Sequence, residues 1–216
     1  MDIFDAIKNR RSVRRFEDRP VPEEIIGKIV EAGQWAPSAC NRQDWKFIIV
    51  DSEEVKGNLL RETTAHFVGK APLLIFVVYS NRTDNLEYKD HLLSAAMAAQ
   101  NMQLAAHALG LGACCINNLP IKSRLRKILN IPRSYDPVAL LCMGYPKAVP
   151  KPLKRKEDID GILCRNSFDF NIEQPAFDLK LNVKRVIRYV YYRCPAFVKK
   201  LLDPLARKFE KKKFDD

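Results

Sequence analysis

Short apolar runs separated by polar segments dominate the first two thirds of the chain. Residues 46–50 (KFIIV) and 73–78 (LLIFVV) are rich in β-branched and aromatic side chains and have the length of buried strands. Residues 137–146 (PVALLCMGYP) predict another strong strand, and residues 113–117 (ACCIN) a shorter one. We therefore expect a sheet of buried strands.

Other segments repeat their apolar residues with a helical period. The opening stretch, residues 2–9, predicts a short helix that Asp2 is placed to cap. Residues 23–36 begin with two acidic residues after a proline and carry an apolar stripe, which is typical of an amphipathic helix. Residues 122–129 predict a further helix, and residues 52–67 show a weaker helical pattern.

The segment 91–112 is rich in alanine and apolar nearly all round. Four polar residues near its middle and end argue against a membrane span: Gln100, Asn101, Gln103 and His107. We expect a long helix buried in the core or at a dimer interface. Because helices and strands do not alternate regularly, an α+β layered fold is favoured over a doubly wound sheet.

Charge is distributed unevenly along the 216 residues. The formal charge is +11, and residues 179–216 contain twelve Lys or Arg and four Asp or Glu, a net of +8, so residues 1–178 carry +3. The basic charge is therefore concentrated in the C-terminal tail.

The six cysteines show no CxxC spacing. With no secretory signal at the N-terminus, they predict reduced thiols in a cytoplasmic protein. The three histidines are scattered without a ligand pattern, so no metal site is expected.

The tail predicts a basic amphipathic helix up to Pro195 and a second, shorter helix after it. Three interpretations remain open for this tail. Its apolar stripe packs on the domain or on a partner subunit, it lies on an anionic membrane surface, or its basic face docks an acidic electron-transfer protein such as a ferredoxin. Nucleic acid is not expected, because no recognised nucleic-acid module is present.

Two basic clusters carry candidate chemistry. One contains Arg10, Arg11, Arg14 and Arg15, and the other contains Lys151, Lys154, Arg155 and Lys156. Arginines at a helix end present forked donors that match phosphate oxygens, although a solvated charged helix end explains the first cluster equally well. The run GLG at residues 110–112 lacks the third glycine of a dinucleotide fingerprint, and no P-loop motif occurs.

A polar turn, APSACNRQDW at residues 36–45, lies between the first two helices and the first strand. Ser38, Asn41 and Gln43 offer donors and acceptors suited to the edge of a heterocycle, although an ordinary loop is also plausible. Two cationic clusters that flank such turns suit a phosphorylated cofactor with a flat ring.

Together these pieces resemble the FMN-dependent nitroreductase family. RRSVRRF (10–16) is similar to its Arg-x-Ser-x-(Arg/Lys)-x-Phe opening, and APSACNRQDWKF (36–47) to its Ala-Pro-Ser-x-x-Asn-x-Gln-Pro-Trp-x-Phe segment. GLGACCI (110–116) and MGYP (143–146) resemble its later strand elements. Four elements in the right order over residues 1 to about 160 make the resemblance specific.

The resemblance implies a nitroreductase-like α+β fold: a central mixed or antiparallel sheet, flanking helices, a long buried central helix, and a homodimer with FMN at the subunit interface. Residues 1–164 would form the FMN-binding domain and residues 165–216 a basic helical extension. The implied FMN-binding residues are Arg10, Arg11, Ser12, Arg14, Pro37, Ser38, Asn41, Cys115, Ile116, Asn117, Lys154 and Arg155.

These implied residues divide into groups with different roles. The arginines and Ser12 would hold the phosphate and ribityl chain or approach the pyrimidine edge, one arginine stabilising the reduced ring, and Lys154 and Arg155 would complete the phosphate site. Pro37, Ser38 and Asn41 would reach the pocket from the partner subunit. The backbone of residues 115–117 would run past the flavin, which carries the chemistry, so no catalytic side chain is expected.

Three positions depart from the family pattern near the expected flavin face. Asp44 stands where proline is usual, Cys115 where tryptophan or proline is common, and Asn118 where glycine is frequent. Cys114 and Cys115 are either reactive thiols or, as we favour, small buried side chains in a strand.

The function that the sequence predicts is electron transfer from NAD(P)H through FMN to a nitroaromatic, a quinone or a similar conjugated acceptor. One alternative is a flavoprotein reduced by a protein donor such as ferredoxin. The other is a non-catalytic protein that binds a membrane surface and has kept this fold. The location expected is cytoplasmic, with a peripheral membrane association open.

Overall fold

The computed structural model describes residues 1–63, 65–117, 119–151, 154–168, 170, 178–195, 198–199, 201–202 and 204. Residues 1–150 form one compact unit and residues 151–216 a second. The expected domain boundary after residue 164 stays a prediction.

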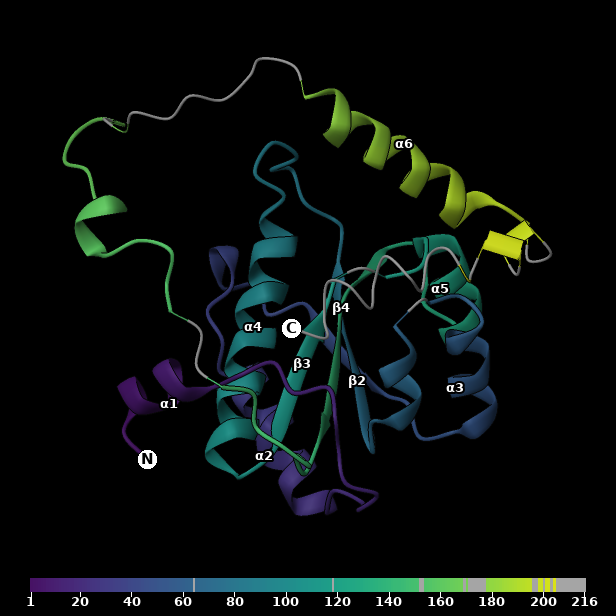
Figure 1. The fold of residues 1–216 in the computed structure, drawn as a ribbon, viewed down its shortest axis with the longest axis horizontal. Helices are drawn as coiled ribbons and strands as arrows, with labels where there is room; N and C mark the ends of the chain where they lie inside the picture. The colour runs from purple at the N-terminus through teal and green to yellow at the C-terminus, as the bar shows by residue number, and fades with distance from the viewer. Residues whose placement is uncertain are drawn as a thin grey trace. The chain divides into compact units, whose positions relative to one another are not determined.

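Four strands of the first unit form one sheet in the order β1-β2-β4-β3 (Figure 1). The strands are β1 (Trp45–Ile49), β2 (Leu73–Ser80), β3 (Gly112–Ile116) and β4 (Tyr135–Gly144). Every neighbouring pair is antiparallel. The four predicted strands are confirmed, and of the two predicted sheet types the antiparallel one is observed among the described residues.

Strand β2 is buried along its whole length, and its side chains alternate between two apolar cores. Ile75 and Val77 belong to the core that α2 (Glu23–Gln34) and α4 (Asp90–Ala108) cover. Leu74 and Phe76 belong to the opposite core, which contains residues of α3 (Glu53–Leu60) and α5 (Lys122–Leu129). The first unit is therefore a sheet between two helical layers, as Figure 1 shows.

Short helices begin where the sequence supplies a cap. In α1 (Ile3–Asn9), the predicted cap is confirmed, because Asp2 Oδ2 accepts a hydrogen bond from the Phe4 N–H at 3.1 Å. The segment 52–67 holds α3 and the start of a 3₁₀ turn, η2 (His66–Lys70), instead of one helix. Two further 3₁₀ turns are η1 (Ala39–Asn41) and η3 (Ile159–Gly161).

Helix α4 is the predicted long helix, but only one face of it is buried. Ala95, Ala98 and Met102 are fully enclosed against the sheet and α2, whereas Leu93 and Met97 are 53% and 40% exposed. A face with exposed apolar side chains at a spacing of four residues remains on the first unit. The expected burial of this helix is observed on one face, and the exposed face is compatible with the other expected environment, a dimer interface, which stays a prediction.

In the second unit, the predicted basic helix is confirmed as α6 (Leu179–Arg193). The second tail helix falls mostly outside the described residues, of which 198–199, 201–202 and 204 are helical. No helix in the described ranges combines the length and the apolar content that a bilayer span requires. The cytoplasmic location stays a prediction.

Gly112 lets the N-terminal segment reach β3, and replacing it tests that contact. An added Cβ would lie 2.6–2.8 Å from three side-chain atoms of Val13. We expect Gly112→Ala to lower the free energy of unfolding by about 1–3 kcal/mol, because overpacking forces the backbone apart. Urea denaturation measures this change, with Gly27→Ala in the open surroundings of α2 as the control. The control should lose no stability, and equal stability of both variants would contradict the close contact.

Candidate functional site

The arginine-rich segment runs along the free edge of β3. Helix α1 ends at Arg10, and Ser12 then forms a parallel bridge with Ala113. The Val13 N–H donates to the Ala113 carbonyl at 3.0 Å, and further along the Glu17 N–H donates to the Tyr145 carbonyl at 2.8 Å. These backbone bonds hold the arginines beside the end of the sheet.

Two of these arginines hold buried nitrogen atoms that have no hydrogen-bond partner among the described residues. Arg10 Nη1 and Arg11 Nε are both enclosed in this way, and His107 Nε2 in α4 is a third such atom. Arg11 Nη1 donates to the carbonyls of Lys8 and Arg10 at 2.6 and 2.9 Å, which fixes the guanidinium. Buried donors normally find acceptors, so this cluster suits an anion. Arg15, in contrast, is exposed.

The charges of these arginines affect the pKa values of two nearby groups, one in α4 and one in β3. Burial lowers the pKa of His107, and the charges of Arg10 and Arg11 lower it further. In β3, burial raises the pKa of Cys114 although the charges of Arg14 and Arg10 oppose it. Arg10 therefore lies near both the end of α4 and β3.

The end of β3 carries the three residues expected to pass a flavin. Ile116 is buried, Cys115 is half-buried and Asn117 is exposed. The Cys115 thiol donates to Asn117 Oδ1 at 3.1 Å. Burial, with a contribution from Cys114, raises the pKa of Cys115 to about 11. The thiol is thus protonated near neutral pH, which favours the interpretation as a structural cysteine.

An alkylation experiment checks this interpretation. At about pH 8 only about one Cys115 side chain in a thousand is a thiolate, so iodoacetamide should modify Cys115 far more slowly than exposed Cys40. Peptide mass spectrometry after short labelling measures both rates in one sample. Modification of Cys115 as fast as that of Cys40 would instead identify it as a reactive thiol.

The predicted polar turn forms a tightly bonded loop beside the start of α4. Ser38 Oγ accepts from the Gln43 N–H at 3.1 Å, and Asn41 Oδ1 accepts from the Gln43 amide at 2.7 Å. Cys40, Asn41 and Gln43 all have left-handed backbone angles, with φ of 50–53°. The Ala39 N–H donates to Ser94 Oγ of α4 at 3.1 Å. Pro37 and Asn41 are exposed on this loop.

Asp44, which replaces the proline usual in the family pattern, has a local structural role. Arg42 and Asp44 form an ion pair at 3.0 Å across the loop, where the family pattern has proline. The carboxylate at position 44 therefore helps to close the turn. Asn118 lies outside the described residues.

A single chain does not bring the loop and the arginines together. The loop is bonded to Ser94 near the start of α4, whereas Arg10 acts on His107 near its end. Thirteen helical residues separate these positions, which corresponds to about 20 Å. The expected contribution of the loop from a partner subunit is compatible with this separation and stays a prediction. Lys154 and Arg155 are exposed in the second unit, and their part in the phosphate site also stays a prediction.

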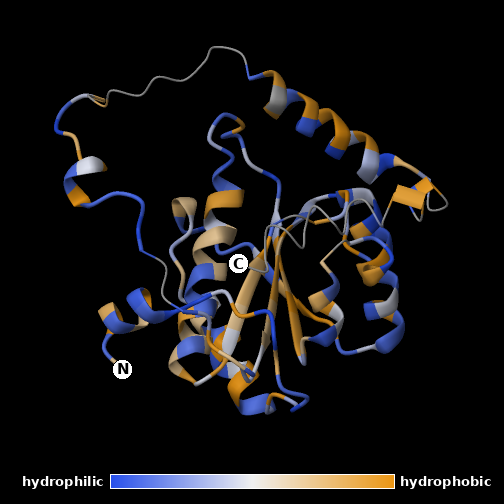
Figure 2. Cartoon of the chain, in the orientation of Figure 1, coloured by the Kyte–Doolittle hydropathy of each residue, from blue (hydrophilic) through white to orange (hydrophobic). Residues whose placement is uncertain are grey.

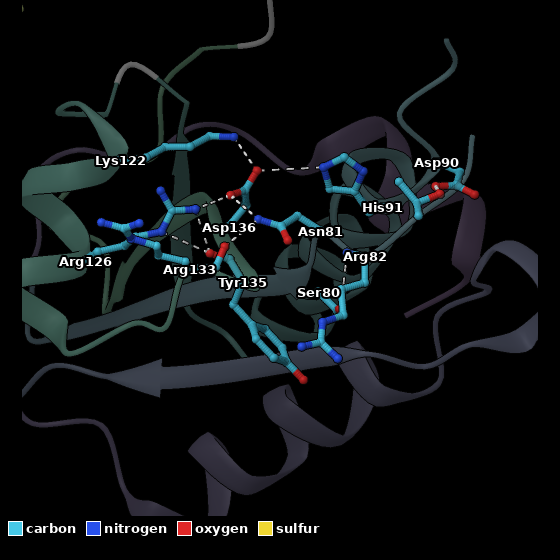
Figure 3. A network of polar contacts seen from close by, with 11 residues as sticks. Ser80, Asn81, Arg82, Asp90, His91, Lys122, Arg126, Arg133, Tyr135 and Asp136 are labelled. Carbon is cyan, nitrogen blue, oxygen red and sulfur yellow. Dashed lines mark hydrogen bonds and ion pairs between the residues drawn. The ribbon is translucent and has the colours of Figure 1, made fainter. Parts of the chain in front are cut away.

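A buried polar network at the start of β4 was not predicted from the sequence. Asp136, 5% exposed, pairs with Lys122 and with Arg126, whose Nη2 lies 2.5 Å from Oδ1 (Figure 3). Asn81 donates to the same carboxylate at 3.1 Å, and His91 Nε2 lies 3.8 Å from it.

The partners of Asp136 decide its ionisation. Burial raises the pKa of this carboxyl, but hydrogen bonds from Lys122 and Asn81 and the charges of Lys122 and Arg126 outweigh it, so the net pKa is lowered. No sequence signal beyond the basic pattern of residues 122–127 indicated this network. It joins α5, β4 and the start of α4, so it ties these elements of the first unit together. In the described part of the chain, no group of three or more acidic, His or Cys side chains could hold a metal ion.

Comparisons with known proteins agree with the motifs. The model of the nitroreductase family matches residues 7–65 and 56–145. The chain belongs to the nitroreductase family. A relative from Methanothermobacter thermautotrophicus is 35% identical to this chain over 154 residues. The matched part covers 69% of this chain and 80% of the relative, which is named as a putative NADH dehydrogenase/NAD(P)H nitroreductase. The family assignment made from the sequence motifs is confirmed.

Solved structures of this family share the fold. A structure from Parabacteroides distasonis, named in the same way, is 30% identical with a TM-score of 0.69 and covers 77% of this chain and 98% of its own. A nitroreductase structure from Desulfovibrio desulfuricans in complex with FMN is also 30% identical, with a TM-score of 0.67, and covers 78% of this chain and 98% of its own. The nitroreductase-like α+β fold is thereby confirmed, and the predicted enzyme class agrees with the names of these proteins.

Proposed function

We propose that this family member is an FMN-dependent oxidoreductase that takes electrons from NAD(P)H and passes them to a nitroaromatic, a quinone or a similar conjugated acceptor. The observation that carries the proposal is the pair of buried, unpartnered nitrogen atoms of Arg10 and Arg11 beside β3. They fit the phosphate of FMN. The nitroreductase structure from Desulfovibrio desulfuricans is also a complex with FMN. FMN supplies hydride transfer when bound.

The chain's own residues position the cofactor in this proposal. Arg10 and Arg11 hold the phosphate, with Ser12 and Arg14 next to them on the bridge to β3. The exposed end of β3 at Asn117 lies beside the ring, where backbone groups orient it. Cys115 stays protonated there, so it presents no thiolate nucleophile to the ring.

A homodimer completes the proposed site. The exposed apolar residues of α4, Leu93 and Met97, together with Ile3, Phe4 and Ile7 of α1, are a surface that water disfavours. Packing this surface against a second copy would bury it. The loop that holds Ser38 and Asn41 would then reach the arginines of the other subunit.

A charge in the α4 surface tests the dimer. We expect Met97→Lys to convert a dimer into a monomer and to lower the FMN content, because an unpaired charge in an interface is costly. Light scattering coupled to size exclusion measures the mass, and Ile49→Lys in exposed β1 is the matched control. A variant that remains dimeric would place the interface elsewhere.

The visible absorption spectrum tests the whole proposal. The purified protein, incubated with FMN and then freed of unbound cofactor, should be yellow, and NADH or NADPH added without oxygen should bleach it. Bleaching identifies the competent reductant, and reoxidation by added quinone or nitroaromatic compounds ranks the acceptors. A protein that cannot take up FMN would contradict the proposed function.

One observation favours a second candidate function. Helix α6 contains five Lys or Arg and no acidic residue, which suits an acidic protein donor such as a ferredoxin. In that case NAD(P)H would leave the yellow protein unbleached, and reduced ferredoxin would bleach it.

A further inference from the structure

Helix α6 is an amphipathic helix of the second unit. It begins after Asp178, whose Oδ1 accepts from the Leu181 N–H at 2.8 Å, and it ends before Pro195. Its 15 residues extend over about 22 Å.

One side of α6 is an apolar stripe. Leu179, Val183, Val186, Ile187 and Val190 recur at intervals of three and four residues, and each is between 48% and 65% exposed. Figure 2 shows hydrophobic and hydrophilic residues on different sides of this helix. Residues 179–193 contain no proline or glycine that would interrupt the stripe.

Five cations occupy positions of α6 outside the stripe. Lys180, Lys184, Arg185, Arg188 and Arg193 belong to this helix, and the helix contains no Asp or Glu. Arg193 stacks on Tyr189 with its guanidinium carbon 3.6 Å from the ring centre. An aromatic residue and arginine at the border of an apolar stripe match the boundary between lipid headgroups and acyl chains.

Charge complementarity favours one occupant for this helix. A second copy of the chain offers residues 1–178 with a net charge of +3, so it does not supply a complementary acidic body. An acidic protein would neutralise the cations but does not require five exposed aliphatic side chains in a row. An anionic bilayer satisfies both properties at once.

We propose that α6 binds anionic membrane surfaces, lying in the plane of the interface with its apolar stripe toward the acyl chains and its cations on lipid phosphates. This inference goes beyond the proposed function and does not depend on it. Membrane binding would place the oxidoreductase unit where apolar acceptors accumulate.

Vesicle cosedimentation of the full chain tests the proposal. The chain should bind phosphatidylcholine vesicles that contain about 30% phosphatidylglycerol and should bind pure phosphatidylcholine far more weakly. Lys184→Gln and Arg185→Gln should each weaken binding about five-fold, the effect of roughly 1 kcal/mol per charge. Lys127→Gln in α5 removes an exposed cation from the first unit and should leave binding unchanged.

A second variant separates lipid insertion from simple charge attraction. Val186→Gln with Ile187→Gln keeps the charge and the helix propensity but removes the centre of the stripe, so vesicle binding should fall at least ten-fold. Unchanged helix content and an unchanged thermal transition show that each variant folds. Binding that disappears with salt but is insensitive to the Val186 and Ile187 changes would overturn the proposal in favour of an acidic macromolecule. Binding of the full chain to neutral vesicles as strong as its binding to anionic vesicles would also overturn the proposal. So would a Val186 and Ile187 variant that changes its oligomeric state but still binds vesicles like the parent.

Discussion

Arg10→Ala is expected to weaken the binding of FMN by about ten- to 150-fold, because a charge-assisted hydrogen bond is worth about 1.5–3 kcal/mol. Arg10 Nη1 is buried and has no partner within the described residues, so an incoming phosphate oxygen would satisfy it without breaking another contact. Fluorescence titration of the flavin measures the dissociation constant. Arg14→Ala should also weaken binding, since the two arginines act together on β3.

Arg15→Ala is the matched control for this experiment. It removes the same side chain from the same segment, but Arg15 is exposed and should change FMN affinity little. Arg10→Lys separates charge from geometry, because an ammonium group retains the charge without the forked donors. Unchanged affinity in both Arg10→Ala and Arg14→Ala would show that the phosphate binds elsewhere.

Asp136→Ala is expected to lower the free energy of unfolding by about 3 kcal/mol, because it leaves Arg126 and Lys122 without their carboxylate partner. We expect the lower end of the usual range for such changes, since Lys122 is half exposed and can turn to water. Chemical denaturation at neutral pH measures the loss. Lys127→Gln, in the same helix as Lys122 and Arg126 but outside the network, is the control.

The stabilisation from Asp136 should depend on pH in one direction. Its pKa is lower in the folded chain than the ordinary value of 3.8, so the ionised carboxylate stabilises the fold fully above that value. The contribution is lost as the pH falls through the lowered pKa. The stability difference between the parent and Asp136→Asn should therefore stay constant from about pH 7 to about pH 5 and shrink as the pH falls below about 4, and a difference that does not shrink there would contradict the role of the charge.

Local patterns in the sequence predicted most elements of the first unit. β-Branched runs identified the strands, and burial of β2 on both faces of the sheet shows why such a run is apolar at every position. The cap at Asp2 is a contact between residues two positions apart, so the sequence alone is enough to predict it. The arginines and the Ser38 loop were identified because their types and order match a family motif.

Contacts between distant residues could not be predicted in the same way. The network around Asp136 joins positions up to 55 residues apart, and nothing near Asp136 in the sequence indicates that it would be buried among cations. The division of α4 into a buried and an exposed face was not predicted, because an alanine-rich helix gives little contrast between its faces. Only the folded chain shows that the loop and the arginines belong to different ends of that helix.

The separation of the arginines and the loop along α4 has a genetic consequence. In the proposed dimer each flavin pocket draws its arginines from one polypeptide and its loop from the other. Two alleles that are each defective, Arg10→Ala and Asn41→Ala, would then complement one another when expressed together. Half of the pockets in a mixed dimer would unite two defects, and the other half would contain none.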